Sequence, residues 1–550
     1  MTRRLGALLG AGLVPGVLAV VAVALLWQRA GTRRELTFHP DEPAHFITAA
    51  MIHDYIVSAP GSSPMAFAEE YYCRYPKVAF GHWPPAFHIA LAGVFLVTGV
   101  SVSAAITAVA LAAAGIAVVL ARRVRPAYGL WSGLLIGVTF LGLTTVRGEL
   151  PLVMADLPLT LVSLLAVLAF ADFVAERRLR DAVCFAGLAS LAVLTKGNAL
   201  ALALLPPLAI LTTGAYGLLR TPKLWLTAVI VGVVCGPWYY FTLQLATGVG
   251  SDDGLSRGYL LRNLQVVPGQ LLVLANSTLL VLAAVGGVLC LIRPARTAVE
   301  ARNSLTLRVV LAWVLAVVMF QLLVPITGEP RYLFPALPGI LLLAWYGFES
   351  VVRMARIRSV WIGRGIPLFG CGLLLAIDAR PLRPLVAGYR AAAERIPVAD
   401  DGPVVLVASN TLGEGAVIVE RRLLDQGRTS YVLRASKALA SDSWSGACYH
   451  SRFETTDELR RYLMDVPVQY LLVDDFPCPE PVTATHLQLL DRLLRESPDD
   501  FPLVGAFPIR GWWRLREGAV RLYENRQALD RAPGTIRVDL HRMLNRHVTH

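Results

Sequence analysis

Long apolar runs separated by short polar segments fill most of this 550-residue chain. A bilayer core about 30 Å thick is crossed by roughly 20 helical residues. The pattern therefore predicts a polytopic α-helical membrane protein with about eleven transmembrane helices. We expect the spans near residues 6–27, 104–121, 129–146, 157–175, 182–195, 199–216, 224–244, 270–291, 307–326, 333–351 and 359–377.

A further apolar run covers residues 85–100. The charges of the loops indicate whether it crosses the membrane, because a span there would move every later loop to the other side. If the run does not span, the loops on the N-terminal side of the membrane hold Arg122, Arg123, Arg125, Arg177, Arg178, Arg180, Arg220, Lys223, Arg293, Arg296, Arg302, Arg353, Arg356 and Arg358. The short outer loops then hold only Arg147, Lys196, Arg257, Arg262 and Arg331. Since basic residues favour cytoplasmic loops, we predict an uncleaved first helix that starts in the cytoplasm. Residues 85–100 then form a juxtamembrane helix on the outer surface.

Two large segments lie outside the apolar pattern, an outer loop over 31–103 and a C-terminal region over 378–550. The C-terminal region lies on the outer side of the membrane if the number of spans is odd. Its strand-like runs at 403–409 and 468–475 alternate with a helix-like stretch at 455–464, which predicts an α/β domain. We therefore divide the chain into a transmembrane module, 1–377, and an extracytoplasmic domain, 378–550, of a multi-pass protein of the cell (inner) membrane.

Composition supports a membrane protein and argues against a nucleic-acid partner. Charged residues make up 16% of the chain, whereas soluble domains contain about 25%. The net charge of +12 comes largely from arginines in the short loops, where membrane topology explains them. The seven cysteines show no CxxC or Cys/His spacing of the kind that holds a metal.

The first outer loop opens with Phe-His-Pro-Asp-Glu-Pro-Ala-His-Phe at 38–46, which places Asp41 and Glu42 about ten residues beyond the first span. Prolines on both sides restrict the backbone there. A functional carboxylate at the membrane interface is one interpretation. Helix capping or a solvated charge is the other.

A histidine-containing cluster, Gly-His-Trp-Pro-Pro-Ala-Phe-His at 81–88, begins the juxtamembrane helix. Trp83 suits an interfacial position. His82 and His88 are open to three interpretations: polar contacts, acid–base groups, or interfacial residues without a further role.

Asp156 lies at the boundary between the second outer loop, which also contains Arg147 and Glu149, and the next span. An aspartate at the bilayer centre costs about 3 kcal/mol, and such residues usually have a partner or a function. A helix N-cap is the alternative.

Two cations, Lys196 and Arg331, lie on the outer side between apolar runs, against the usual charge distribution. Binding of an anionic lipid phosphate would explain both, since arginine offers a fork of donors and lysine a point charge. Salt bridges to Asp156, Glu149 or Glu329 would explain them equally well.

Six segments, taken in order over about residues 1–350, resemble the GT-C glycosyltransferases of the protein O-mannosyltransferase and lipid A aminoarabinose transferase type. They are DEPAHF at 41–46, HWPPAFH at 82–88, MADLPLTLVSLLAVLAF at 154–170, LAVLTKG at 191–197, GPWYY at 236–240 and EPRYLFPALPGILLL at 329–343.

The resemblance implies a polyprenyl-phosphate sugar donor and catalysis at the outer face of the membrane. Asp41 would be the general base, and the predicted catalytic residues are Asp41, Glu42 and Asp156. The predicted substrate-binding residues are His82, Lys196, Arg331, Tyr332 and Arg147. The sequence requires no cofactor. Some members of the family bind a divalent metal, which stays an open option because no residue here demands one.

Two alternatives from other functional classes stay open, a transporter or flippase of lipid-linked sugars and a non-catalytic membrane scaffold. A transporter would place charges deep within helices or contain paired broken helices, whereas the unusual charges here gather at one face. The sequence names neither the sugar nor the acceptor. The C-terminal region lies outside the resemblance, and its Gly-containing segment 408–416 is a candidate turn for an anion or a sugar.

Overall fold

The computed structural model describes residues 2–30, 34–246, 256–324, 328–354, 360–382, 386–399, 402–441, 449–475, 484–510, 518–531, 537–539 and 547–549. The chain divides into two compact units. Unit 1 comprises residues 1–29, 81–87 and 107–382, and unit 2 comprises residues 30–80, 88–106 and 383–550.

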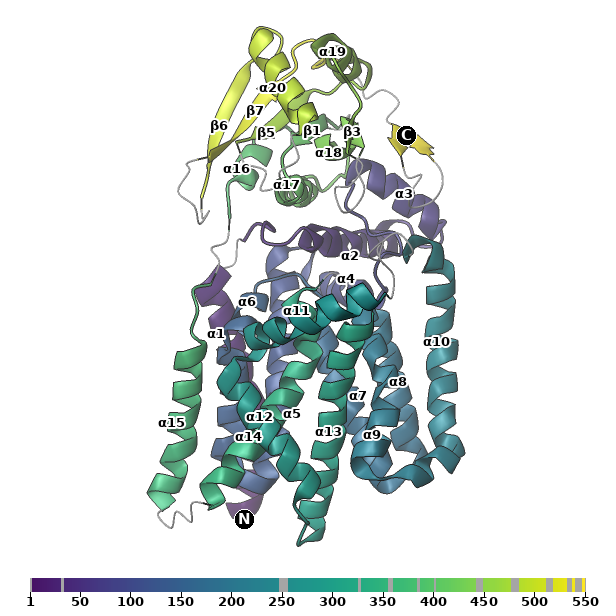
Figure 1. Cartoon of the computed structure of the whole chain (residues 1–550). Helices are drawn as coiled ribbons and strands as arrows, with labels where there is room; N and C mark the ends of the chain where they lie inside the picture. The colour runs from purple at the N-terminus through teal and green to yellow at the C-terminus, as the bar shows by residue number, and fades with distance from the viewer. Residues whose placement is uncertain are drawn as a thin grey trace. The chain divides into compact units, whose positions relative to one another are not determined.

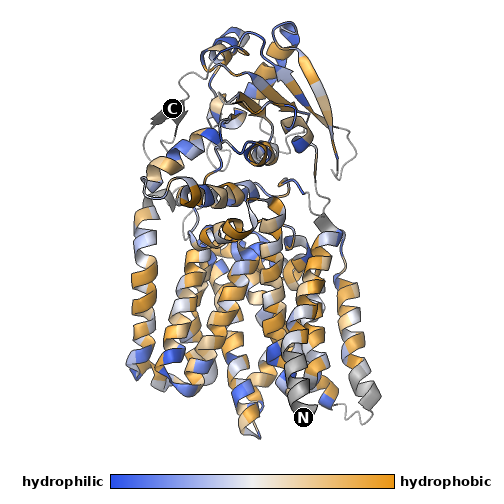
Figure 2. Cartoon of the chain, turned by 180° about the vertical axis from the view of Figure 1, so that it is seen from behind, coloured by the Kyte–Doolittle hydropathy of each residue, from blue (hydrophilic) through white to orange (hydrophobic). Residues whose placement is uncertain are grey.

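Unit 1 is an all-helical bundle whose long helices run side by side in Figure 1. Its elements are α1 (Thr2–Ala30), α5 (Val102–Gly142), α6 (Thr144–Glu149), α7 (Asp156–Glu176), α8 (Leu179–Thr195), η1 (Gly197–Ala203), α9 (Leu205–Thr213), η2 (Tyr216–Arg220), α10 (Pro222–Ala246), α11 (Arg257–Ala275), α12 (Ser277–Ile292), α13 (Ala298–Leu323), η3 (Pro330–Ala336), α14 (Leu337–Met354) and α15 (Val360–Asp378). Figure 2 shows apolar residues along most of their length, which fits a bundle immersed in lipid.

Among the described residues, five helices are long and apolar enough to cross a membrane, or six if the bent pair α11 and α12 forms one span. Shorter apolar helices cover Gly12–Gln28, Ala86–Thr98, Gly197–Thr213 and Gly365–Asp378. The chain is a multi-pass membrane protein. The predicted total of eleven spans stays a prediction.

Helix α5 contains two of the predicted spans, joined at Gly129. This glycine has φ 91° and ψ 174°, outside the helical region. Beyond it, a Cβ on Gly133 would lie 2.8 Å from the carbonyl oxygen of Ala121, and one on Gly137 would lie 3.1 Å from that of Ala117. The second half of α5 therefore packs back against the first as a helical hairpin, and glycine allows this close approach.

The continuous span predicted over 270–291 is corrected by the structure. Its first residues belong to α11, which meets α12 at 100°. The break falls at Asn276, whose φ is 34° and whose side chain accepts a hydrogen bond from the backbone N–H of Leu279. Asparagine tolerates a positive φ and caps helices well, so the chain can bend there. The apolar residues continue on both sides of Asn276, and the hydrophobic pattern therefore does not predict the bend.

Unit 2 combines the first outer loop with the C-terminal region. Its helices are α2 (Asp41–Ser58), α3 (Pro64–Arg74), α4 (Ala86–Thr98), α16 (Tyr389–Ala393), α17 (Thr411–Leu424), α18 (Ala435–Ala438), α19 (Thr456–Asp465) and α20 (Thr485–Glu496). Its strands are β1 (Val404–Ala408), β2 (Tyr431–Arg434), β3 (Ala440–Ser441), β4 (His450–Ser451), β5 (Tyr470–Asp474), β6 (Leu503–Ile509), β7 (Gly518–Glu524), β8 (Arg537–Asp539) and β9 (His547–Thr549). Helix α4 has 13 residues, or about 20 Å, too short to cross a bilayer.

The main sheet of unit 2 has the order β2-β1-β5-β7-β6. Strands β2, β1 and β5 are parallel, and β7 and β6 continue the sheet antiparallel. The strands expected at 403–409 and 468–475 are present as β1 and β5. Helices α19 and α20 cover the face that carries Leu406 and Leu471, so alternate residues of the strands form one core.

Side chains of the first outer loop bind the C-terminal region within unit 2. Arg422 of α17 donates to Asp54 of α2 at 2.5 Å, and the Tyr75 hydroxyl donates to Asp425 at 3.1 Å. The backbone N–H of Tyr389 donates to Glu35 at 2.9 Å. All these acceptors are buried, so segments about 350 residues apart in the chain form one folded unit.

Candidate functional site

An ion pair between Asp156 and Lys196 lies at the centre of the candidate site in unit 1. The Lys196 ammonium donates to Asp156 Oδ1 at 2.7 Å, and the two residues are 8% and 1% exposed, respectively. Asp156 is the first residue of α7 and Lys196 follows α8. Both placements suit the helix dipole, which favours an anion at an N-terminus and a cation at a C-terminus. Ala155 is the N-cap of α7 and makes no side-chain capping bond, so the capping alternative for Asp156 is wrong.

Tyr332 and Arg331, at the start of η3, complete this cluster. The Lys196 ammonium lies 5.1 Å from the centroid of the Tyr332 ring, and the Arg331 guanidinium lies 5.2 Å from it. Arg331 also pairs with Glu329 at 2.6 Å. Both cations therefore form salt bridges, as the structural alternative expected, and their binding of a lipid phosphate stays a prediction. Both cations lie within cation–π distance of one aromatic ring.

Three buried polar atoms of α7, η1 and α11 have no hydrogen-bond partner within the described residues. They are Asp156 Oδ2, Asn198 Nδ2 and Gln270 Nε2. Asn198 lies two residues beyond Lys196. Gln270 Nε2 lies close to Gly328, the residue before Glu329, since a Cβ added to this glycine would be 2.6 Å from that nitrogen. Buried polar groups are normally satisfied by protein or water, so these atoms can bind a water molecule or a polar ligand. Sequence reasoning missed Asn198 and Gln270, because an amide beside an apolar run gives no distinctive signal.

The Asp41–Glu42 pair begins α2 in unit 2. Glu42 is 0% exposed, and its two carboxylate oxygens accept hydrogen bonds from Arg34 at 2.8 and 2.7 Å. It also accepts from the backbone N–H groups of Phe38 and His39, at 3.3 and 3.1 Å. These contacts favour a structural role for Glu42, and its predicted catalytic role stays a prediction. The sequence gives no signal for the Arg34 pairing.

Asp41 has surroundings different from those of Glu42. Its carboxylate lies 3.4 Å from His39 Nδ1, and its backbone N–H donates to the same nitrogen at 3.1 Å. The residue is 8% exposed, and Pro40 is the N-cap of α2 without a side-chain capping bond. Asp41 is thus a carboxylate beside an imidazole at a helix N-terminus, an arrangement that can accept a proton from a hydroxyl.

The other predicted site residues are placed as follows. His82, in unit 1, packs edge-on against Trp83 with 4.7 Å between the ring centroids. Arg147 is half-buried in α6. Asp41 belongs to unit 2 and Asp156 to unit 1, so the predicted convergence of these two carboxylates stays a prediction.

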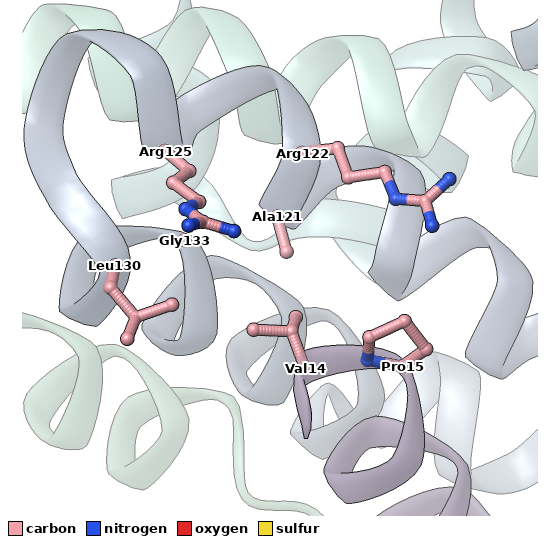
Figure 3. A pocket seen from close by; sticks show the side chains of 7 residues that line it. All are labelled: Val14, Pro15, Ala121, Arg122, Arg125, Leu130 and Gly133. Atoms are coloured by element: carbon pink, nitrogen blue, oxygen red, sulfur yellow. The ribbon is translucent and has the colours of Figure 1, made fainter. Parts of the chain in front are cut away.

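A cavity of about 210 Å³ lies elsewhere in unit 1, at the turn of α5. Figure 3 shows Val14 and Pro15 of α1 beside Arg122, Arg125 and Leu130 of α5. None of the residues that line it belongs to the predicted site.

The described residues contain no group of three or more His, Cys, Asp or Glu side chains placed to hold a metal ion. The divalent metal that the sequence left open stays an open option.

Comparisons with known proteins agree with this fold. Residues 82–241 match the model of a family described as dolichyl-phosphate-mannose-protein mannosyltransferase. The chain is similar to the crystal structure of ArnT from Cupriavidus metallidurans in the apo state, with 15% identity, a TM-score of 0.55, and coverage of 93% of this chain and 98% of that one. It is also similar to ArnT from the same organism bound to undecaprenyl phosphate, with 17% identity, a TM-score of 0.54, and coverage of 92% and 97%. No curated protein sequence matches the chain.

The matches define a polytopic membrane protein with a fold similar to that of ArnT. The resemblance to the GT-C glycosyltransferases of the protein O-mannosyltransferase and aminoarabinose transferase type is confirmed.

Proposed function

We propose that this chain is a glycosyltransferase that moves a sugar from a polyprenyl-phosphate donor to an acceptor at the outer face of the membrane. The family description names a dolichyl-phosphate sugar, and one similar ArnT structure has undecaprenyl phosphate bound. The observation that carries the proposal is the buried Asp156–Lys196 pair on the Tyr332 ring, with polar atoms nearby that lack a partner among the described residues.

The cations of unit 1 are assigned to the donor phosphate. Lys196 and Arg331 supply the positive charge that stabilises a leaving phosphate, and Asp156 holds the lysine in position. Tyr332 forms the floor beneath both cations. His82 and Arg147 are assigned to further contacts with the substrate. The chain of the donor stays in the bilayer, which explains a site at the membrane boundary.

Asp41 is assigned as the general base. Its carboxylate takes the proton of an acceptor hydroxyl as that oxygen bonds to the anomeric carbon of the sugar. The bond from the anomeric carbon to the phosphate oxygen breaks, and its electron pair leaves with the polyprenyl phosphate. Phosphate is a good leaving group, so no separate acid is needed. On this proposal the chain crosses the membrane about eleven times and its C-terminal α/β domain lies outside the cytoplasm.

Replacement of Asp41 by Asn tests the catalytic assignment. We expect Asp41→Asn to keep the fold and the binding of donor while transfer falls about 10²- to 10⁴-fold, the usual contribution of a general base. The measurement is mass spectrometry of lipid-linked sugars and glycans from a deletion strain that expresses either protein. Asp457→Asn, at an exposed position of α19, is the matched control and should transfer normally.

Normal transfer by Asp41→Asn would overturn the assignment. If the chain is a transporter or a scaffold, in which this carboxylate has no chemical role, the substitution should leave the lipids and glycans of the strain unchanged.

A further inference from the structure

The α5 cavity, the hollow of about 210 Å³ at the turn of α5, contains two arginines that the proposed function does not use. Among the described residues that line it, only Arg122 and Arg125 are charged. Within the described part of the chain, neither guanidinium forms a hydrogen bond or a salt bridge. Like charges on one helix face repel each other, so this pair without an anion needs an explanation.

The two guanidinium groups are placed to meet the same anion. Arg122 and Arg125 lie three residues apart on α5, so their Cβ atoms are about 5–6 Å apart on one face of the helix. Figure 3 shows both side chains on one side of the α5 cavity, with Val14 and Pro15 of α1 on the other. A Cβ on Gly133 would lie 3.3 Å from Cβ of Arg125, so this glycine lets the second half of α5 close the hollow. Arginine presents a fork of donors that suits a phosphate.

The remaining lining of the α5 cavity is apolar, and an apolar groove continues from it along α1. Pro15 and Ala19 share a face of α1, because residues four apart lie above one another on a helix. The described residues that line the groove, a second hollow of about 370 Å³, are Ala19, Val20, Val23, Ala24 and Trp27. From Pro15 to Trp27 the helix rises about 18 Å. Since half of the hydrocarbon core is about 15 Å thick, the groove has the length of an acyl chain of one leaflet.

The α5 cavity lies at the opposite end of unit 1 from the Asp156–Lys196 pair. The second half of α5 returns to the end where the first half begins, and α6 then leads to Asp156 at the start of α7. Residues 102–128 extend about 40 Å before the turn, which is enough to cross the hydrocarbon core. The turn therefore lies at the membrane face whose loops carry most of the arginines, the face predicted to be cytoplasmic. Anionic lipids give the cytoplasmic leaflet its negative surface potential.

We propose that the α5 cavity binds an anionic phospholipid of the cytoplasmic leaflet. The phosphate lies between the guanidinium groups of Arg122 and Arg125, and one acyl chain follows the groove of α1. A zwitterionic lipid fits less well, because its ammonium group is repelled by the two arginines. A polyprenyl chain is longer than the groove. The inference goes beyond the proposed function, since the site shares no residue with it.

Native mass spectrometry of the purified full-length protein in detergent measures lipid binding directly. The probes are phosphatidylglycerol, which is anionic, and phosphatidylcholine, which is zwitterionic. We expect phosphatidylglycerol to bind at least about tenfold more tightly than phosphatidylcholine. Arg122→Gln combined with Arg125→Gln should weaken phosphatidylglycerol binding about thirtyfold, since each arginine near lipid phosphates contributes about a factor of five.

Two further variants separate a built site from general attraction to positive charge. Arg220→Gln combined with Arg296→Gln is the matched control, because it removes the same charge from exposed positions that do not line the cavity. It should bind phosphatidylglycerol like the unchanged protein. Ala121→Leu keeps both arginines but fills the hollow, toward which the Ala121 side chain points in Figure 3, so it should also weaken binding. Should Ala121→Leu fail to fold, the arginine variants still decide the question.

Unchanged phosphatidylglycerol binding in the Arg122 and Arg125 variant would overturn the proposal. An equal loss in both double variants would overturn it as well, because it would show attraction to net charge without a site. Undecaprenyl phosphate is titrated in parallel. If only its binding falls in the Arg122 and Arg125 variant, the cavity belongs to a polyprenyl phosphate and the proposal fails. Lipid binding is measured without sugar transfer, so an active Asp41→Asn protein would refute the general base and leave this result standing.

Discussion

Replacing Arg422 by Met should loosen the first outer loop from the C-terminal region. Arg422 donates to Asp54 Oδ2 from Nε at 3.2 Å and from Nη2 at 2.5 Å, and Nε also donates to the Tyr71 hydroxyl at 2.7 Å. Tyr71 in turn donates to Asp54 at 2.9 Å. Asp54 and Arg422 are 5% and 7% exposed. The substitution therefore leaves a buried carboxylate without its main partner.

The expected loss follows from that geometry. Removing one member of a buried ion pair costs about 3–5 kcal/mol, because the remaining charge stays desolvated. At about 1.4 kcal/mol for each factor of ten, local opening should become about 10²- to 4 × 10³-fold more frequent. Arg422→Lys keeps the charge but loses the planar fork of donors, so its effect should be smaller.

Amide hydrogen exchange of the intact protein in detergent measures the opening directly. We expect the loss of protection in peptides from 41–58 and 411–424, while those from 157–175 in unit 1 stay unchanged. Arg495→Met is the control, because Arg495 pairs with Asp491 at the surface of α20 and such pairs contribute about 1 kcal/mol or less. Unchanged protection in α2 and α17, or an equal loss throughout the chain, would refute the reasoning.

Two further substitutions test other buried charges. Burial, and after it repulsion by Glu35, raises the pKa of the Glu420 carboxyl to about 8. Between about pH 4.5 and 8 the folded chain therefore binds more protons than the unfolded chain. The free energy of unfolding then falls with rising pH, by up to about 1.4 kcal/mol per pH unit. Glu420→Gln should flatten that slope in thermal unfolding between pH 5 and 8, and an unchanged slope would contradict the assignment. Lys196→Met should destabilise unit 1 by about 3–5 kcal/mol by leaving Asp156 buried alone. Adding Asp156→Asn should recover most of that loss, and a double variant as unstable as the single one would disprove the pairing.

Local sequence pattern predicted the helical membrane class and much of the candidate site. Apolar runs about 20 residues long require lipid or a core around them, and their spacing located most of the helices. Asp156, Lys196 and Arg331 could be singled out because a charge next to an apolar run is unfavourable without a partner or a function. The bend at Asn276 could not be seen, because the apolar run continues through it.

Contacts between distant segments were decided by the tertiary structure alone. Lys196 pairs with Asp156, 40 residues away, and Arg422 pairs with Asp54, 368 residues away. Nothing in the hydrophobic pattern distinguishes Glu42, held by Arg34, from the neighbouring Asp41. Periodicity specifies which face of a helix is buried, whereas a polar partner is chosen by the packing and desolvation of groups that meet only in the folded chain. The sequence by itself therefore determined the class of protein and the charged residues worth testing, and the fold decided which of them are paired.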